Sequence, residues 1–230
     1  HGGGLGRAAL LGSTIGVAVG ISSTDFAHVL AAGPHARSVY AATAASLSIA
    51  SGRLSYVLGL QGPCLAVETA CSASLVALHV AARALRQREC EAHVAAGVNL
   101  ILLPSSSSGL AAAGMTSASG RSHTFDSRAD GFARGEGSCA VVLRAGESAQ
   151  ARELSGSSVM QDGRSASLTA PNGQAQRALL CAALADAGVA PAALARAEAH
   201  GTGTKLGDPI EAGSLAGAVL AARGEACGAL

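Results

Sequence analysis

Cys71 stands where a short apolar run gives way to a longer segment with helical spacing, and small residues flank it in Thr69-Ala-Cys-Ser-Ala-Ser-Leu75. We expect Cys64–Glu68 to form a strand and Ser72–Gln87 a helix, which puts the cysteine at a strand-to-helix turn. A helix N-terminus offers backbone N–H groups and a positive dipole end, which favour a thiolate and can stabilise an oxyanion. The same residue types also fit a buried structural cysteine, and spacing alone leaves both interpretations open.

The other five cysteines lack this strand–turn–helix setting, and we expect them to be structural: Cys64, Cys90, Cys139, Cys181 and Cys227. The six cysteines form no C-x-x-C pair and no zinc-finger spacing. We therefore predict no metal site and a reducing, cytoplasmic compartment.

His200 leads the glycine-rich segment Glu198-Ala-His-Gly-Thr-Gly-Thr-Lys-Leu-Gly-Asp-Pro-Ile-Glu211. Its glycines have G-x-G-x-x-x-G spacing and no Lys-Ser/Thr pair follows, so neither a dinucleotide-binding loop nor a P-loop is predicted. An imidazole held at the end of a strand can donate a hydrogen bond to an enolate or thioester oxygen, or move a proton near neutral pH. We expect His200 to be such a catalytic ring.

Alternating strand and helix patterns indicate a layered α/β fold. Nearly continuous apolar runs predict strands buried on both faces at Thr14–Val19, Cys64–Glu68, Val94–Val98 and Ala140–Leu143, with further candidates at Ser155–Met160 and Arg196–Ala199. Helical spacing predicts helices over Ser72–Gln87 and Gln174–Ala187. The Ser/Gly-rich segments Ser105–Gly109 and Ser117–Ser122 predict surface loops. We expect one domain over 1–230 with an internal pseudo-repeat near residue 145.

Composition excludes several classes of protein. Of the 230 residues, 49% are hydrophobic and 13% are charged, which is enough apolar material for a sizeable core. A net charge of +1 and an aromatic content of 2% argue against a nucleic-acid partner. No apolar run reaches the ~18 residues expected of a membrane span, and the start of the chain does not have the pattern of a signal peptide.

Around Cys71, the sequence resembles the active-site motif of the β-ketoacyl synthases (ketosynthases), and Leu58-Gly-Leu-Gln-Gly-Pro63 resembles the segment those enzymes carry before it. Further similar segments follow in the family's order: Ala96–Leu100, Thr124–Gly137, Gln161–Arg164, Leu168–Asn172 and Glu198–Thr204. The resemblance covers residues 14–222 and is closer to modular polyketide synthases than to stand-alone fatty-acid enzymes. It implies a thiolase-like layered αβαβα fold with both ends truncated, the N-terminal half ending at about residue 145 and the C-terminal half beginning at about 146.

The resemblance also implies roles for individual residues. Cys71 corresponds to the acyl-accepting nucleophile and His200 to the first histidine of the family's Cys-His-His set. Thr202 and Thr204 correspond to the threonines that hydrogen-bond the pantetheine arm of a carrier. Glu211 corresponds to a buried acid that organises the site, although a helix-start carboxylate that meets the helix dipole fits this position as well.

The implied reaction is a decarboxylative Claisen condensation, in which an acyl-Cys intermediate and a malonyl-type carrier-protein thioester give a 3-oxoacyl thioester. No cofactor is expected beyond the phosphopantetheine of the acyl carrier protein, and the parent enzyme is expected to be a homodimer. The family's second histidine, in a Lys-x-Asn-x-Gly-His motif, and its Gly-Phe-Gly-Gly loop lie beyond the family position where this chain ends. We therefore expect the fragment alone to be inactive.

Two alternatives share much of this pattern. A thiolase-type acyltransferase has the same fold and a strand-end cysteine, but it uses coenzyme A thioesters and its motifs differ around Cys71 and His200. A non-condensing, ketosynthase-like domain that only binds a carrier protein is the second alternative.

Overall fold

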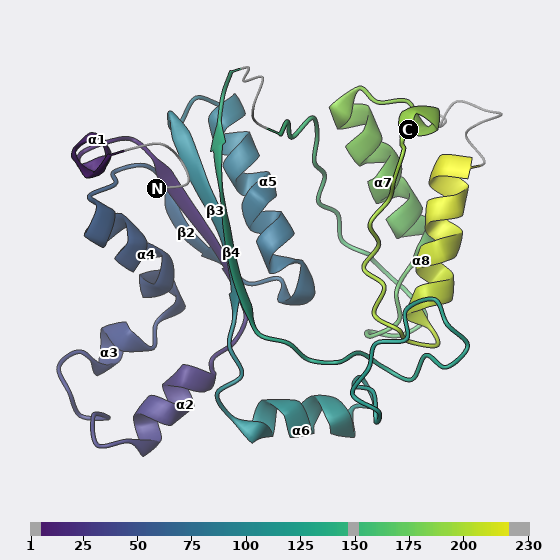
Figure 1. Ribbon diagram of the computed structural model, residues 1–230, viewed down its shortest axis with the longest axis horizontal. Helices are drawn as coiled ribbons and strands as arrows, with labels where there is room; N and C mark the ends of the chain where they lie inside the picture. The colour runs from purple at the N-terminus through teal and green to yellow at the C-terminus, as the bar shows by residue number, and fades with distance from the viewer. Residues whose placement is uncertain (1–5, 147–151, 221–230) are drawn as a thin grey trace. The chain divides into compact units, whose positions relative to one another are not determined.

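The strands of the computed structural model form one mixed sheet of four strands in the order β2-β1-β3-β4 (Figure 1). β1 (Gly16–Ile21) lies between β2 (Cys64–Val67) and β3 (Ala92–Asn99) and runs parallel to both, whereas β4 (Gly137–Arg144) runs antiparallel to β3. Parallel strands need crossover connections, and helices supply them here. The α/β architecture expected from the alternating pattern is therefore confirmed.

The structure describes residues 6–146 and 152–220, and contacts divide them into two compact units. The first unit contains residues 6–106 and 135–146 and holds the whole sheet, and the second contains 107–134 and 152–220.

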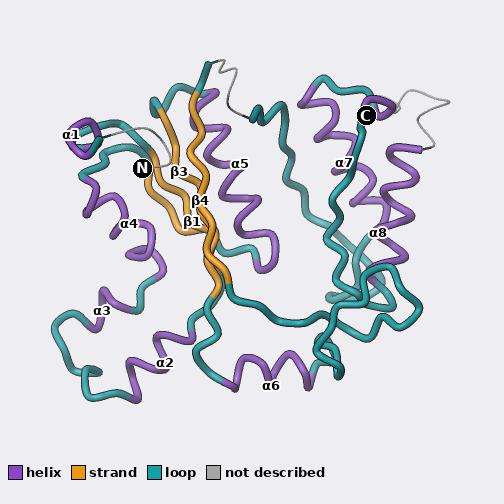
Figure 2. Tube along the Cα trace, in the orientation of Figure 1, coloured by secondary structure: helices purple, strands orange, loops and turns teal. Residues whose placement is uncertain are grey.

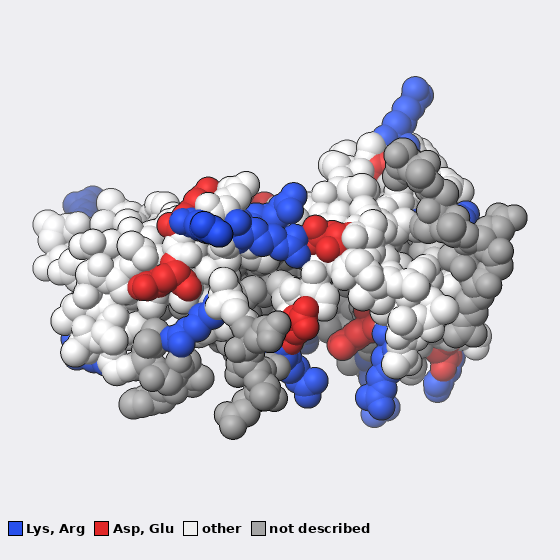
Figure 3. Space-filling view, turned by 90° about the horizontal axis from the view of Figure 1, so that it is seen from above, with Lys and Arg blue, Asp and Glu red and all other residues white. Residues whose placement is uncertain are grey.

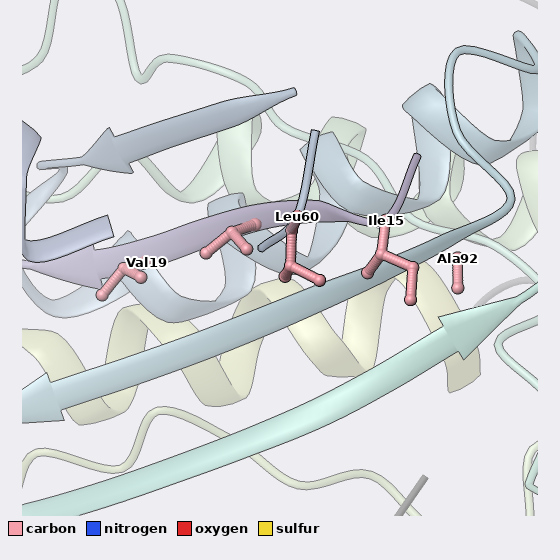
Figure 4. Packing of buried hydrophobic residues seen from close by; sticks show 5 residues of the cluster. Ile15, Val19, Leu60 and Ala92 are labelled. Carbon is pink, nitrogen blue, oxygen red and sulfur yellow. The ribbon is translucent and has the colours of Figure 1, made fainter. Parts of the chain in front are cut away.

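One face of the sheet carries the larger apolar side chains of the core. Figure 4 shows this buried cluster, which consists of Ile15, Val17, Val19, Leu60 and Ala92. Leu58, the last residue of α4 (Leu47–Leu58), packs against it, so α4 covers this side of the sheet (Figure 2). Continuous burial along β1 follows from its central place in the sheet, as the apolar run predicted.

The opposite face of the sheet carries small residues and faces α5 (Ala73–Arg86) (Figure 2). The residues of β1 and β3 on this face are Gly16, Ala18, Gly20, His93, Ala95 and Gly97. The buried residues of α5 are all alanines, at 73, 77, 81, 82 and 84. Small side chains on both surfaces let the helix lie close to the sheet, and this fixes the position of its first turn.

The first unit also contains the shorter helices α1 (Arg7–Leu10), α2 (Asp25–Ala32) and α3 (Ala41–Ala44). Helix α6 (Pro104–Ala112) begins in the first unit and continues into the second. Asp25, which is 7% exposed, accepts hydrogen bonds from the backbone N–H groups of Leu102 and Leu103, both at 3.1 Å, and from the Ser106 hydroxyl at 3.2 Å. This carboxylate therefore satisfies donors at the start of α6 that have no partner inside the helix.

The second unit contains two packed helices, α7 (Gly173–Ala187) and α8 (Gly207–Leu215). The Asn172 side chain caps α7 by accepting the N–H groups of residues 174 and 175, and Gly188 ends the helix at a φ of 63°. The Ser214 hydroxyl donates to the carbonyl of Gly173 at 3.0 Å and so ties α8 to the start of α7. A 3₁₀ turn (Pro191–Ala193) lies between them and a π-helical turn (Ala216–Leu220) follows α8.

Three expectations from the sequence are wrong. Ser105–Gly109 is not a loop but lies inside α6, because Pro104 is compatible with a first helical position and Asp25 supplies a cap from far away in the chain. Ser155–Met160 and Arg196–Ala199 form no strand in the described part of the chain. β2 and β4 are largely exposed rather than buried on both faces, since both are edge strands of the sheet.

Charges are scattered over the surface. On the face shown in Figure 3, Lys and Arg side chains lie among Asp and Glu side chains, and most of the surface carries neither. Within residues 6–146 and 152–220, no helix is both long and apolar enough to cross a membrane.

Candidate active site

Cys71 lies in a tight turn between a strand and a helix, as the flanking small residues predicted. β2 ends at Val67, a 3₁₀ turn covers Ala70–Ser72, and α5 begins at Ala73. Ala70 has a φ of 52°, a left-handed conformation that is rare for a residue with a Cβ. The turn leaves Cys71 exposed and reduced at the start of the helix. A structural cysteine is typically buried, so this exposure together with the place at a helix start favours the nucleophile interpretation.

Side chains around the turn bond to its backbone. The Glu68 carboxylate accepts the N–H of Ala70 at 2.8 Å, and the Ser72 hydroxyl donates to the carbonyl of Thr69 at 2.8 Å. The Ser22 hydroxyl donates to the carbonyl of Ala70 at 3.3 Å. The backbone hydrogen bond from Ala70 lowers the pKa of the Glu68 carboxyl below its ordinary value.

Two glycines bring the first turn of α5 onto the sheet. A Cβ on Gly20 would lie 2.5 Å from the backbone carbonyl carbon of Ala73, and a Cβ on Gly97 would lie 2.6 Å from the Cβ of Ser74. Both distances are far below van der Waals contact, so a larger residue at either position must displace the helix start. The closeness of Cys71 to the sheet therefore depends on these glycines.

The other cysteines have different surroundings from Cys71. Cys64 and Cys139 are exposed like Cys71, contrary to a buried structural role, but they lie within the strands β2 and β4 and not at a helix start. Cys90 is buried, and desolvation raises the pKa of its thiol. Cys181 on α7 is disulfide-bonded, which the sequence did not lead us to expect because all the cysteines were assigned to a reducing compartment. Cys227 lies outside the described residues.

In the second unit, the His200 loop is held by Glu211 on α8. Glu211 accepts the backbone N–H of His200 at 2.5 Å with one carboxylate oxygen and that of Gly201 at 2.8 Å with the other. His200 is exposed, while Glu211 is half-buried. Gly201 and Gly203 have φ values of 55° and 71°, so the glycines permit a left-handed path that other residues rarely adopt.

Thr202 and Thr204 lie in the same loop, with their hydroxyl oxygens 3.2 Å apart. The Thr204 hydroxyl also accepts the N–H of Gly207, the first residue of α8, at 3.1 Å. The structure thus brings together four of the five predicted site residues, His200, Thr202, Thr204 and Glu211, in one unit, and it assigns Cys71 to the other unit. The chemical roles of all five stay predictions.

Asp208 is a residue of this loop that sequence reasoning missed. It is only 4% exposed and its carboxylate accepts three backbone N–H groups, from Phe125 at 2.6 Å, Gly203 at 3.0 Å and Thr204 at 3.4 Å. An acidic residue in the first turn of an expected helix can be recognised in a sequence, since negative charge is favourable at that position. The bond to Phe125 could not be found in this way, because no local pattern links the two residues.

The segment Thr124–Gly131 packs against the His200 loop through its backbone. The Thr124 hydroxyl donates to the carbonyl of Gly201 at 2.6 Å, and the N–H of Gly131 donates to the carbonyl of Gly203 at 2.9 Å. Phe125 has a φ of 55°, which is strained for a bulky side chain. Two segments of the second unit that are distant in sequence are therefore fixed against each other by hydrogen bonds.

Charged residues near this segment make structural contacts. Asp126 pairs with Arg128 at 2.7 Å, and the Arg128 side chain holds the pKa of the Asp126 carboxyl far below its usual range. Arg134 donates to the Ser107 hydroxyl at 2.7 Å. Among residues 6–146 and 152–220, no three His, Cys, Asp or Glu side chains are grouped so that they could hold a metal ion.

The first unit has a cysteine at a strand-to-helix turn and the second has a histidine in a glycine-rich loop, and these are the features expected from the resemblance to condensing enzymes. Residues 1–149 match the family model "Beta-ketoacyl synthase, N-terminal domain", and residues 151–228 match "Beta-ketoacyl synthase, C-terminal domain". The chain belongs to the β-ketoacyl synthase family.

Similar curated proteins are polyketide synthases. A mycocerosic acid synthase-like polyketide synthase of Mycolicibacterium smegmatis is 42% identical over 93% of this chain, and a phenolphthiocerol/phthiocerol polyketide synthase of Mycobacterium tuberculosis is 45% identical over 94%. The match spans 10% of the first protein and 14% of the second. The chain is thus similar to one small part of each of these long proteins.

Solved ketosynthases have the same fold. The ketosynthase from module 6 of the bacillaene synthase of Bacillus subtilis 168 superposes with a TM-score of 0.82 at 33% identity, over 94% of this chain and 38% of that one. An oxazolomycin ketosynthase domain of Streptomyces albus JA3453 gives 0.82 at 37% identity, over 93% and 39%. The thiolase-like fold expected from the resemblance is confirmed, and so is the identification as a ketosynthase domain of the polyketide-synthase type.

Proposed function

We propose that this ketosynthase domain uses Cys71 to accept an acyl group from the thioester of an acyl carrier protein. In this step the Cys71 sulfur forms a bond to the acyl carbonyl carbon, the carrier's carbon–sulfur bond breaks, and the thiol proton passes to the departing sulfur. The observation that carries the proposal is the exposed position of Cys71 in a left-handed turn at the start of α5. Backbone N–H groups at a helix start can stabilise both a thiolate and the oxyanion of the acyl-transfer step.

The second half of the proposed reaction is condensation. Loss of CO₂ from a malonyl-type thioester gives a carbanion, which attacks the acyl carbonyl carbon, and the bond to the Cys71 sulfur breaks to release a 3-oxoacyl thioester. His200 assists by donating a hydrogen bond to the enolate oxygen. Support comes from the two hydrogen bonds through which Glu211 fixes the backbone of residues 200 and 201, since a fixed loop gives the imidazole a defined position.

Thr202 and Thr204 are proposed to bind the pantetheine arm of the carrier, and Glu211 is proposed to organise the His200 loop. The phosphopantetheine belongs to the substrate, and no cofactor is proposed for the domain itself. The domain is further proposed to act as a homodimer, in the cytoplasm. A thiolase reaction with coenzyme A is less well supported, because the similar proteins are polyketide synthases.

The test uses a ketosynthase domain that contains this chain and has the length of the solved relatives. It is called the extended domain below. After incubation with an acyl-carrier thioester, mass spectrometry of peptides should locate the acyl group on Cys71. Cys71→Ala should abolish the adduct, while Cys139→Ala, which removes another exposed cysteine, should leave it unchanged. An adduct on Cys64 or Cys139 with Cys71 unmodified contradicts the proposal. Loading on Cys71 without any 3-oxoacyl product identifies a non-condensing domain instead.

A further inference from the structure

Ala70 adopts a backbone conformation that alanine rarely occupies. Its φ of 52° brings the Cβ too close to the backbone, so an unrestrained alanine prefers negative φ. Ala70 immediately precedes Cys71, and its dihedral angles therefore set the direction in which the cysteine side chain leaves the turn. Such strain persists only where surrounding groups hold it in place.

Two side chains hold this turn, and both follow directly after neighbouring strands. Ser22 follows β1 and Glu68 follows β2, and the parallel register pairs Gly20 with Val67, so the sheet brings the two residues to the same edge. The Glu68 carboxylate accepts the N–H of Ala70 at 2.8 Å, and the Ser22 hydroxyl donates to the carbonyl of the same residue at 3.3 Å. Both peptide groups of Ala70 are thus fixed from outside the turn.

We propose that Glu68 and Ser22 are positioning residues, which hold the left-handed turn at Ala70 and thereby aim the Cys71 thiol at the acyl group. This inference rests on the proposed role of Cys71 as the acyl acceptor. Glu68 itself forms and breaks no covalent bond. What it contributes is an acceptor oxygen for the N–H of Ala70, so a neutral amide at this position should serve nearly as well as the carboxylate.

The first experiment compares Glu68→Ala with Glu68→Gln in the extended domain. Glu68→Ala should lower kcat for acyl loading of Cys71 by roughly tenfold or more, because small misplacements of a reacting group have large effects on rate. KM for the carrier thioester should stay the same, since the substitution does not touch a carrier-binding group. Glu68→Gln should retain most of the activity, and Ser22→Ala should fall between the two.

The second experiment uses the conformational freedom of glycine. Ala70→Gly removes the Cβ that disfavours positive φ, so the turn no longer depends fully on Glu68. In the Glu68→Ala background, Ala70→Gly should therefore restore a large part of the lost loading rate, although it adds no contact. A general loss of folding would not be repaired in this way.

A third readout does not need a carrier protein. The rate at which iodoacetamide alkylates Cys71 should fall in Glu68→Ala and recover in the double variant. Glu91→Ala serves as the control, because Glu91 is exposed and lies just before β3, at the end of that strand opposite to Gly97, which contacts the start of α5.

Three results overturn the inference: unchanged loading and alkylation in Glu68→Ala, equal damage in Glu68→Gln and Glu68→Ala, or no recovery with Ala70→Gly. If the unsubstituted extended domain fails to load acyl groups at all, the proposed function fails, and the alkylation rates still decide the role of Glu68 and Ser22.

Discussion

The carboxylate of Asp208, at the start of α8, accepts the backbone N–H of Phe125 at 2.6 Å, although 83 residues separate them in the sequence. The other carboxylate oxygen accepts the N–H groups of Gly203 and Thr204. One buried side chain therefore holds both the strained Phe125 turn and the loop that follows His200. One carboxylate oxygen bonds to Phe125 and the other bonds to Gly203 and Thr204. Replacing one oxygen by an amide nitrogen therefore removes the bonds to one of the two segments only.

Asp208→Ala should lower the free energy of unfolding of the extended domain by about 2–4 kcal/mol, because it leaves three backbone N–H groups, among them that of the buried Gly203, without their acceptor. Asp208→Asn should be less damaging, because the amide oxygen can still accept from one of the two segments while the amide nitrogen cannot. Urea unfolding measures both. Asp130→Ala is the control, since it removes an exposed carboxylate and should leave the unfolding midpoint unchanged. Equal stability of Asp208→Ala and the unsubstituted domain contradicts the prediction.

Local patterns predicted the parts of this protein that depend on near neighbours. The continuous apolar run around Val17 and Val19 identified a strand with both faces covered, and the small residues next to Cys71 identified the turn. His200 and Glu211 fall within one motif, so their grouping could be expected from the sequence. Such features follow from side chains only a few residues apart.

Features that depend on distant residues could not be predicted in this way. Ser105–Gly109 has the composition of a loop, and it is helical with the help of Asp25, whose bond to Leu103 joins residues 78 positions apart. The Asp208–Phe125 bond is a second case. The exposure of β2 and β4 was missed because an apolar run shows that a strand exists but not that it lies at the edge of a sheet.

His200→Ala in the extended domain should slow condensation and malonyl decarboxylation far more than it slows acyl loading of Cys71. The reason is that the helix start assists the thiolate, whereas the imidazole acts on the oxyanion that develops during condensation. Single-turnover assays with separate acyl and malonyl carriers distinguish the two steps, with a loss of roughly a hundredfold or more expected in condensation. The exposed histidine variant His35→Ala should change neither step. Equal losses in both steps would instead identify His200 as the base that activates Cys71.

His93 should make the domain less stable in mild acid. It is fully buried on β3, its Nε2 has no hydrogen-bond partner among the described residues, and burial lowers the pKa of the ring below its ordinary value of 6.5. The unfolded chain therefore binds the proton more readily than the folded one, and stability declines as the pH falls from about 6.5 toward the lowered pKa. The unfolding midpoint measured between pH 7.5 and pH 5 tests this.

His93→Leu should reduce this decline while keeping the stability at pH 7.5 within about 1 kcal/mol, since it removes an unsatisfied polar atom at similar volume. His35→Gln, which changes an exposed histidine, should retain the full acid dependence. If stability declines with falling pH in His93→Leu as much as in the unsubstituted domain, the His93 ring does not cause the acid dependence.

Gly20→Ala should both destabilise the domain and slow the reaction of Cys71. The new Cβ would lie 2.5 Å from backbone atoms of Ala73 and Ser74, so relief requires the first turn of α5 to move away from the sheet rather than a side chain to rotate. We expect a loss of about 1–3 kcal/mol in the free energy of unfolding, typical of overpacking. The alkylation rate of Cys71 should fall at the same time, because the thiol is carried on the displaced turn.

Gly97→Ala should have the same effects in weaker form, since its closest contact is the Cβ of the Ser74 side chain at 2.6 Å and not the helix backbone. Gly52→Ala is the matched control within α4, where nothing lies within 4 Å of the added Cβ. There the substitution should raise stability by about 0.5–1 kcal/mol through the better helix propensity of alanine, with no change at Cys71. Urea unfolding and timed iodoacetamide labelling of the three variants give both quantities. If Gly20→Ala matched Gly52→Ala in stability and in Cys71 reactivity, the close approach of α5 to the sheet would not be what positions the nucleophile.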